Sequence, residues 1–242
     1  MFDHVTIRVS DRDASRLFYD TVLRTVGIER PDADDSYAEW DDFSLAEAGP
    51  DEPVTSGLHV AFVAPTRGHV DEFWRVGTEA GYRDDGAPGW RPQYREDYYG
   101  SFLLDPDGNS VEAVHHGAMR GGGIDHLWVR VADVAAARRF YEVVAPFAGL
   151  RLKDDTPSRA RFVGGSGSFS LVDGTPTKPF HLAFPADDDG VVDAFHRAAT
   201  AAGYRDNGAP GERPEYHDGY YGAFVLDPDG HNVEVVNHNR DR

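Results

Sequence analysis

The stretch "DYYGSFLLDPDGNSVEAV", residues 97–114, decides the fold because the chain contains it twice. It returns as "GYYGAFVLDPDGHNVEVV", residues 219–236. In both copies an apolar run leads into Asp-Pro-Asp-Gly, and a second apolar run follows. Proline at the second turn position and glycine at the fourth suit a type I turn, so each copy is predicted to be a β-hairpin. Each second strand carries one glutamate, Glu112 or Glu234, among apolar residues.

The repetition extends over the whole chain at one constant offset of 122 residues, which sets His126 against His4. "FDHV" at residues 2–5 falls on "IDHL" at 124–127, and "GYRDDGAPG" falls on "GYRDNGAPG". A period of this length indicates a duplicated domain and not a solenoid of small repeats. The predicted domains are residues 1–116 and 124–242, and the glycine-rich "GAMRGGG", residues 117–123, is predicted to link them.

Hydrophobic periodicity predicts the same order of elements in each half. "HVTIRVS" alternates as a strand, and a helix capped by Ser10 or Asp11 follows through about Val26. The remaining predicted elements of the first half are strands around Tyr37–Trp40 and Phe43–Ala46, the strand "LHVAFVA", a helix at about Gly68–Ala80, and the hairpin. Helices near Val134–Val144 and Val191–Ala202 are predicted in the second half. The predicted fold class is α+β: two tandem domains, each a pair of βαβββ modules forming a curled mixed sheet with helices on its outer face.

Composition and charge exclude several classes of partner. The 242 residues carry a net charge of −18, which would repel nucleic acid or an anionic membrane surface. No apolar run approaches the roughly 20 residues that a membrane span needs, and the N-terminus has no signal region. We therefore expect a cytoplasmic protein that binds neither nucleic acid nor a membrane. A small-molecule substrate and a monomeric or homodimeric state are separate expectations that the charge does not decide. Because the chain has no cysteine, a metal ion would have to be held by histidine and carboxylate.

Strand alternation predicts which side chains share a face, since residues i and i+2 point the same way. Two histidines and one glutamate in each half fall on the polar face of their strands, opposite the apolar residues that pack under the helices. These six residues are His4, His59, Glu112, His126, His181 and Glu234. Two imidazoles and one carboxylate form the facial triad that suits Fe(II), with Mn, Ni or Zn as alternatives. The sequence thus predicts divalent-metal sites.

With these features the chain resembles the vicinal oxygen chelate superfamily, which includes glyoxalase I, extradiol dioxygenases, fosfomycin-resistance thiol transferases and bleomycin-resistance proteins. The resemblance rests on the duplicated modules, the histidine in the first strand of each module, and the "DPDG(N/H)xxE" hairpin ending, and it covers essentially the whole chain. It implies that the six residues are metal ligands. Because the family exchanges modules between domains, the resemblance leaves two groupings open: His4 with His59 and Glu112, or His4 with His181 and Glu234, and correspondingly for the other three.

The same resemblance gives candidate catalytic residues but no single reaction. The extradiol signature places a histidine upstream of a Leu-Tyr pair before the turn; His217 matches the histidine, whereas phenylalanine occupies the tyrosine position as Phe102 and Phe224. His217 is therefore a candidate general acid or base, with a surface loop histidine as the alternative. Tyrosines beside each hairpin could supply a phenol instead, and the candidates are Tyr99 and Tyr221, with Tyr98 and Tyr220 next to them.

Three functions fit these residues. The first is a metal-dependent enzyme, a dioxygenase or else a lyase or isomerase, whose metal chelates an oxygen-rich substrate and stabilises a developing oxyanion. The second is a non-catalytic binding protein of the bleomycin-resistance type, which needs no metal. The third, thiol transfer to an antibiotic, would need a thiol pocket that the sequence does not identify. The Pro/Gly-rich residues 86–97 and 208–219 are expected to be lids or long loops over the site.

Overall fold

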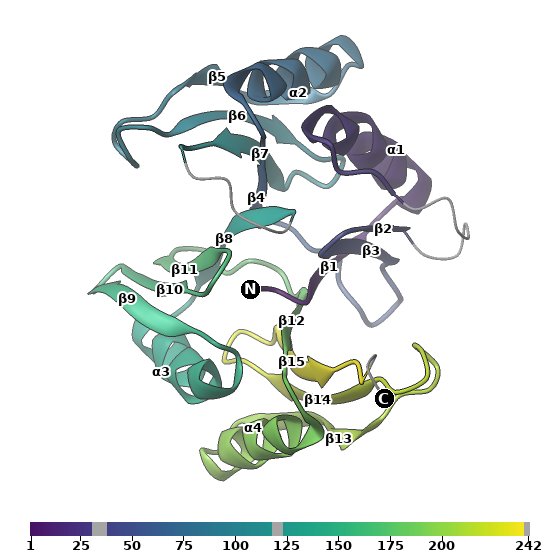
Figure 1. The fold of residues 1–242 in the computed structure, drawn as a ribbon, viewed down its shortest axis with the longest axis vertical. Helices are drawn as coiled ribbons and strands as arrows, with labels where there is room; N and C mark the ends of the chain where they lie inside the picture. The colour runs from purple at the N-terminus through teal and green to yellow at the C-terminus, as the bar shows by residue number, and fades with distance from the viewer. Residues whose placement is uncertain (31–37, 118–122, 240–242) are drawn as a thin grey trace. The chain divides into compact units, whose positions relative to one another are not determined.

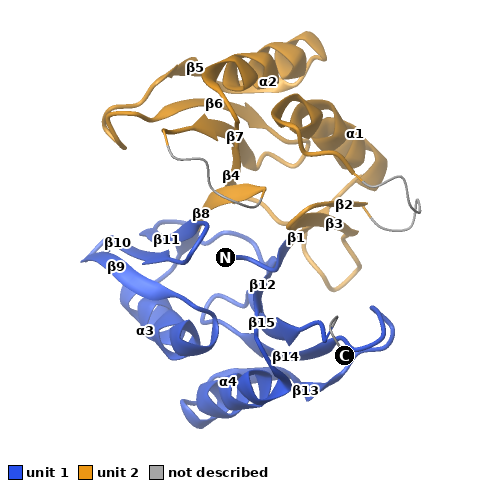
Figure 2. Cartoon of the chain, in the orientation of Figure 1, with its two compact units in different colours: residues 1–5, 130–242 blue, residues 6–129 orange. Residues whose placement is uncertain are grey.

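The computed structural model describes residues 1–30, 38–117 and 123–239. Tyr37 and the centre of the predicted linker, residues 118–122, lie outside these ranges. The chain forms two compact units, shown in Figure 2: unit 1 comprises residues 1–5 and 130–242, and unit 2 comprises residues 6–129. Each unit thus has its own core and, as shown below, its own candidate site.

The elements follow one another in the predicted order. The first half contains β1 (His4–Val9), α1 (Arg12–Leu23), η1 (Arg24–Val26), β2 (Ala38–Trp40), β3 (Phe43–Glu47), β4 (His59–Val63), α2 (Arg67–Glu79), β5 (Arg83–Trp90), β6 (Tyr99–Leu104) and β7 (Ser110–His115). The second half contains β8 (Ile124–Val131), α3 (Val134–Val144), η2 (Ala145–Phe147), β9 (Arg151–Thr156), β10 (Arg159–Val163), β11 (Ser168–Asp173), β12 (His181–Pro185), α4 (Asp189–Ala201), β13 (Arg205–Glu212), β14 (Tyr221–Leu226) and β15 (Asn232–Asn237). The predicted α+β fold of repeated βαβββ modules is confirmed.

The strands form two mixed sheets, of seven and eight strands. In unit 2 the order β5-β6-β7-β4-β8 combines a parallel β4–β7 pair with antiparallel neighbours. Unit 1 repeats this as β13-β14-β15-β12, with β12 parallel to β15. Helix α2 packs on β5, β6 and β7, and α4 packs on β13, β14 and β15, as Figure 1 shows. The helices therefore cover one face and leave the other to the polar residues.

The helices begin and end where local chemistry requires. The Asp11 carboxylate accepts a hydrogen bond from the Ala14 main-chain N–H, which caps α1. The last turn of this predicted helix is 3₁₀, and α3 has its predicted bounds. Gly81, which follows α2, has φ of +90° and so allows the left-handed conformation that ends the helix. Among the described residues, no helix is long and apolar enough to cross a membrane.

The Pro/Gly-rich segments differ from their prediction as loops, because residues through Trp90 form strand β5 and the matching residues form β13. Among the described strands, β5 pairs only with β6, so it is an edge strand. Proline lacks an N–H and is tolerated at such an edge, where one side of the strand needs no donor. The register shifts on both sides of Gly86, which shows how a strand accommodates this composition.

A buried aspartate fixes each Asp-Pro-Asp-Gly turn. One Asp105 oxygen accepts the main-chain N–H groups of Asp107 and Asn109, at 3.0 and 2.8 Å, and the other accepts the Tyr19 hydroxyl of α1 at 3.0 Å. Asp227 is bound in the same way by Asp229, His231 and Tyr141. Because α1 or α3 supplies the phenol, each turn is tied to a helix, and the strand that follows enters the sheet in one register.

Helix–sheet packing differs between the units in a way that gives a test. A methyl group on Gly77 of α2 would clash with the Leu103 side chain of β6. The offset-matched residues of unit 1 are Ala199 and Val225, a larger residue against a smaller one. Gly77→Ala should lower the free energy of unfolding by roughly 1 kcal/mol, because overpacking costs about 1–3 kcal/mol and the gain in helix propensity is only about 1 kcal/mol. The double variant Gly77→Ala/Leu103→Val should recover most of this loss, measured by urea unfolding. If the effects of the two substitutions simply add, the packing argument is wrong.

The turn aspartate of unit 1 gives a pH-dependent prediction. Burial, partly offset by the N–H groups of His231 and Asp229, raises the pKa of Asp227 from 3.8 to about 7. Since the folded pKa exceeds the unfolded one, this carboxyl stabilises the fold fully below pH 4, and its contribution is lost as the pH rises to about 7. Asp227→Asn keeps a side-chain oxygen that accepts the turn N–H groups but removes the titrating carboxyl. The free energy of unfolding of the variant, relative to that of wild type, should therefore increase between pH 4 and 7. Urea unfolding at several pH values measures this, and a constant difference between the two proteins would contradict the prediction.

Candidate metal centres

The sheet register of unit 2 brings two histidines and a glutamate together. His126 of β8 and Glu112 of β7 both lie opposite Ala61 of β4, one on each side, so the three residues form a row across three strands. His59 precedes Ala61 by two residues and therefore points from the same face. The small Ala61 side chain leaves space between its neighbours, and the ligand-type atoms of His59, Glu112 and His126 all lie within 4.8 Å of one another.

The atoms that converge in unit 2 are two ring nitrogens and one carboxylate oxygen. Glu112 Oε2 lies 3.0 Å from His59 Nε2 and 3.6 Å from His126 Nε2. The Glu112 side chain is almost fully buried, while the two rings are each more than 10% exposed. The group thus sits at the edge of the core, with both histidine rings partly exposed.

Unit 1 contains the equivalent group, made of His4, His181 and Glu234. His4 Nε2 and Glu234 Oε2 each lie 2.9 Å from His181 Nε2, and they are 3.7 Å from each other. Of the two groupings that the sequence leaves open, the structure has the exchanged one: a histidine from the first strand of one half joins the other two residues of the opposite half. All six predicted ligand residues are brought together in this way.

Hydrogen bonds behind the rings of unit 2 determine where their protons are. Ser110 Oγ donates to the Asp85 carboxylate at 2.8 Å, so it accepts from His59 Nδ1 at 3.1 Å. Asp125 Oδ2 likewise accepts from His126 Nδ1 at 2.9 Å. A neutral imidazole with its proton on Nδ1 has a lone pair on Nε2, the atom that binds a metal ion. In this form both Nε2 atoms direct lone pairs toward Glu112 Oε2, which is also an acceptor.

In unit 1, Asp3 Oδ1 accepts from His4 Nδ1 at 2.8 Å, which again leaves Nε2 with a lone pair. The Asn232 side-chain nitrogen donates to His181 Nδ1 at 2.8 Å, and the Asn232 oxygen accepts from Asn207 Nδ2 at 2.9 Å. His181 Nδ1 is therefore an acceptor, unlike Nδ1 of the other three histidines of the two groups. The ring orientations in the two units are therefore fixed by different partners.

The aspartates behind the first-strand histidines are ionised. Burial alone would raise the pKa of Asp3, but hydrogen bonds from His238 and His4 outweigh burial and lower it well below the usual range. For Asp125, hydrogen bonds from His116 and His126 outweigh burial in the same way. A carboxylate that accepts the Nδ1 proton of a metal-binding histidine orients the ring and makes its other nitrogen a stronger donor.

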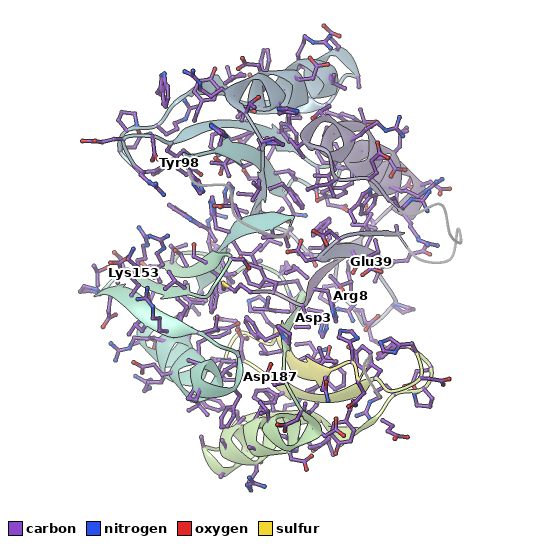
Figure 3. The ribbon with its side chains drawn as sticks, in the orientation of Figure 1. Asp3, Arg8, Glu39, Tyr98, Lys153 and Asp187 are labelled. Carbon is purple, nitrogen blue, oxygen red and sulfur yellow. The ribbon has the colours of Figure 1, made fainter. Side chains whose placement is uncertain are left out.

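A tyrosine holds the second oxygen of each glutamate. The hydroxyl of Tyr98, just before β6 (Figure 3), donates to Glu112 Oε1 at 2.6 Å, and that of Tyr220 donates to Glu234 Oε1 at 2.7 Å. Glycine makes room for this contact, because a Cβ on Gly222 would lie 2.5 Å from Glu234 Oε1. One oxygen of each carboxylate is thus used internally, and Oε2 alone faces the two histidines.

The three predicted catalytic residues lie elsewhere. The hydroxyl of Tyr99 donates to Asp71 of α2, and that of Tyr221 donates to Asp193 of α4, so both bond to the helix side of the sheet. His217 Nε2 contacts His238 Nδ1 at 2.8 Å and does not belong to either histidine–glutamate group. A role in catalysis stays a prediction for all three.

Strand alternation did not predict three pairs of residues that contact the two histidine–glutamate groups or their aspartates. Asp3 and Asp125 precede the first-strand histidines directly, where alternation would point them to the opposite face. His116 and His238 match across the 122-residue offset, which was the available signal for them. Tyr98 and Tyr220 were named only beside Tyr99 and Tyr221, because sequence does not show which of two adjacent tyrosines faces the glutamate.

The donor set of unit 2 fits a cation. When both rings are neutral with the proton on Nδ1, three acceptor atoms converge, and their lone pairs repel one another unless a cation lies between them. Two imidazole nitrogens and one carboxylate oxygen are ligands that Fe(II), Zn²⁺ and related divalent ions accept. A metal ion bound to His59, Glu112 and His126 would satisfy all three, and the ligand set of unit 1 is the same.

Comparison with known proteins identifies the family and the fold. Residues 1–113 and 123–235 each match the family described as the Glyoxalase/Bleomycin resistance protein/Dioxygenase superfamily. Among solved structures, glyoxalase I from Zea mays is 19% identical with a TM-score of 0.70, over 98% of this chain and 92% of that one. A candidate dioxygenase from Bacillus subtilis is 13% identical with a TM-score of 0.65, over 98% of this chain and 84% of that one. No curated protein matches the sequence.

The tyrosine contact gives a test that needs no metal. Tyr98→Phe should destabilise the metal-free protein by about 1–3 kcal/mol, because it leaves the buried Glu112 Oε1 without a donor. Tyr99→Phe, the matched control, removes an exposed hydroxyl bond and should change stability by less than about 0.5 kcal/mol. Urea unfolding in the presence of a chelator measures both. Equal effects of the two substitutions would show that the Tyr98 hydroxyl is not required by Glu112.

Proposed function

The chain belongs to the glyoxalase/bleomycin resistance protein/dioxygenase superfamily, and on that premise we propose that it is a divalent-metal-dependent enzyme acting on a small, oxygen-rich substrate. The superfamily combines metal-dependent enzymes with non-catalytic binding proteins, so family membership alone does not separate the two. The choice rests on the residues of the candidate sites.

The observation that carries the proposal is the convergence of two ring nitrogens and one carboxylate oxygen in unit 2. His59 and His126 each donate from Nδ1 to a group behind the ring, so the Nε2 atoms that meet Glu112 Oε2 are the ones that can bind a cation. A pocket that only sequesters an organic ligand has no need for this arrangement. The same ligand types converge in unit 1, which supports the same conclusion.

Fe(II) is the ion that we propose first. Two histidines and one carboxylate leave several coordination positions open for substrate oxygens, which is the arrangement used by non-haem Fe(II) oxygenases. Mn, Ni and Zn accept the same ligands and remain alternatives. The bound ion would act as a Lewis acid toward two neighbouring oxygens of the substrate.

The chain's own residues would prepare this chemistry. Tyr98 keeps Glu112 Oε1 occupied, so the carboxylate would offer one oxygen to the ion and block no further position. The rings of Phe102 and Trp128 lie 6.0 and 6.1 Å from the His59 ring and would shield the bound substrate from water. With phenylalanine at the position of the extradiol tyrosine, lyase or isomerase chemistry is proposed beside dioxygenase chemistry.

Metal content tests the proposal. Protein purified without oxygen and reconstituted with Fe(II), Mn, Ni or Zn should bind one ion in each unit, measured by inductively coupled plasma mass spectrometry. Glu112→Gln and Glu234→Gln should each remove one ion and the double variant both, because a neutral amide is a weak ligand. Glu215→Gln, on the surface, is the control and should keep both ions.

The outcome that contradicts the proposal is a folded protein that stays metal-free with every ion. That result would favour the binding-protein alternative. With Fe(II) bound, a panel of catechols observed for the colour of ring cleavage tests the dioxygenase branch, and hemithioacetals of small oxoaldehydes test the lyase and isomerase branch.

A further inference from the structure

A chain of hydrogen bonds extends outward from His4 in unit 1. Asp3 (Figure 3) accepts from His4 Nδ1 through Oδ1 and from His238 Nε2 through Oδ2, both at 2.8 Å. His238 Nδ1 lies 2.8 Å from His217 Nε2, and the two rings are stacked with an interplanar angle of 12°. His217 Nδ1 ends the chain, 2.9 Å from the carbonyl oxygen of Asp218.

The acceptors at both ends fix the number of protons in the two outer rings. A carbonyl oxygen only accepts, so His217 Nδ1 must carry a proton. Asp3 is an ionised carboxylate, so His238 Nε2 must carry one too. The contact between His217 Nε2 and His238 Nδ1 requires one further proton. The two rings therefore hold three protons on their four nitrogens. Two neutral imidazoles hold only two, so the pair has a single positive charge.

The matching positions of unit 2, all within its described residues, hold Arg95 and His116 and not two histidines. His116 corresponds to His238 and donates from Nε2 to Asp125 at 2.8 Å, but its buried Nδ1 has no hydrogen-bond partner among the described residues. Arg95 stands at the position of His217 and binds Asp97 instead. A neutral His116 satisfies every contact that the structure gives it.

We propose that His217 and His238 share one proton and act through Asp3 as positioning residues that tune His4, so that the two candidate metal centres are not equivalent. The inference rests on the proposed metal-dependent function. While the pair is charged, its cation draws Asp3 toward His238 and adds a positive charge near the site, which weakens His4 as a ligand. When the shared proton leaves, Asp3 polarises His4 more strongly and binding of a divalent ion becomes tighter.

Two titratable side chains contact the pair within the described part of the chain. They are Asp3, from the N-terminal segment, and Tyr220, next to β14. Asp3 stays ionised, as described above. Burial, together with Glu234, raises the pKa of Tyr220 far above its ordinary value, so its hydroxyl remains protonated.

Nuclear magnetic resonance of ¹⁵N-histidine in the metal-free protein tests the shared proton directly. We expect three ring protons on His217 and His238, one of them hydrogen-bonded between the rings, and loss of that proton as the pH rises. In His217→Gln the amide can donate to His238 Nδ1, so His238 should be neutral throughout. Two neutral rings over the whole pH range in which wild type is folded would overturn the proposal.

Zn²⁺ affinity, measured against a competing chelator, tests the tuning of His4. Glu112→Gln isolates the unit 1 centre, and Glu234→Gln isolates that of unit 2. Across the pH range in which the pair loses its proton, the unit 1 centre should gain about tenfold more affinity than the unit 2 centre. His217→Gln should abolish this extra gain, whereas Arg95→Gln, the matched control, should change nothing.

Identical pH profiles for the two centres, or an unchanged profile in His217→Gln, would overturn the tuning. Failure of Zn²⁺ to bind either centre would overturn the proposed function and the tuning with it. The two failures are distinguishable, because the resonance experiment on metal-free protein reports the shared proton whether or not any metal binds.

Discussion

The register of the strand after each Asp-Pro-Asp-Gly turn is the constraint on which the candidate sites depend. A shift of one residue would turn Glu112 into the helix-covered core and bring Val111 to the polar face. Asp105 prevents this shift, because its carboxylate is held by main-chain N–H groups of the turn and by the Tyr19 hydroxyl of α1. A helix at the start of the chain thus fixes the position of a glutamate about 90 residues later.

The capacity of this site to bind a metal ion depends on which ring nitrogens carry protons as well as on the distances between the side chains. Histidines in a strand can rotate and exchange tautomers, and a group of three acceptors is stable only if outer partners fix those choices. In unit 2, Ser110 and Asp125 do so from behind the two rings, while Tyr98 occupies the spare oxygen of Glu112. These contacts leave the two Nε2 atoms and Glu112 Oε2 to face one another.

Strand alternation in the sequence predicted which residues belong to the candidate sites, but it did not predict which of them lie together. Alternation placed His4, His59 and Glu112 on one face of their strands; it carries no information on which strands are neighbours. Because β4 lies beside β8, His59 meets His126 and not His4. Asp125 shows a second limit: it precedes His126 and by alternation points away, yet its carboxylate reaches the ring at 2.9 Å. Proline and glycine similarly concealed edge strand β5, since strand propensity describes interior strands better than edges.

The two halves of the chain share the six candidate ligand residues but differ in the residues around them. This difference changes the charge near each site. Around the unit 2 site, Glu112 and Asp125 contact the histidines directly, and Asp85 is linked to His59 through Ser110. In unit 1 the neutral Asn207 replaces Asp85 at the matching position, and the His217–His238 pair adds a positive charge. Identical ligands therefore present two different fields to the same ion. The affinity for a divalent cation depends strongly on nearby charge. The residues around the ligands, and not the ligands themselves, therefore distinguish the two halves of the chain.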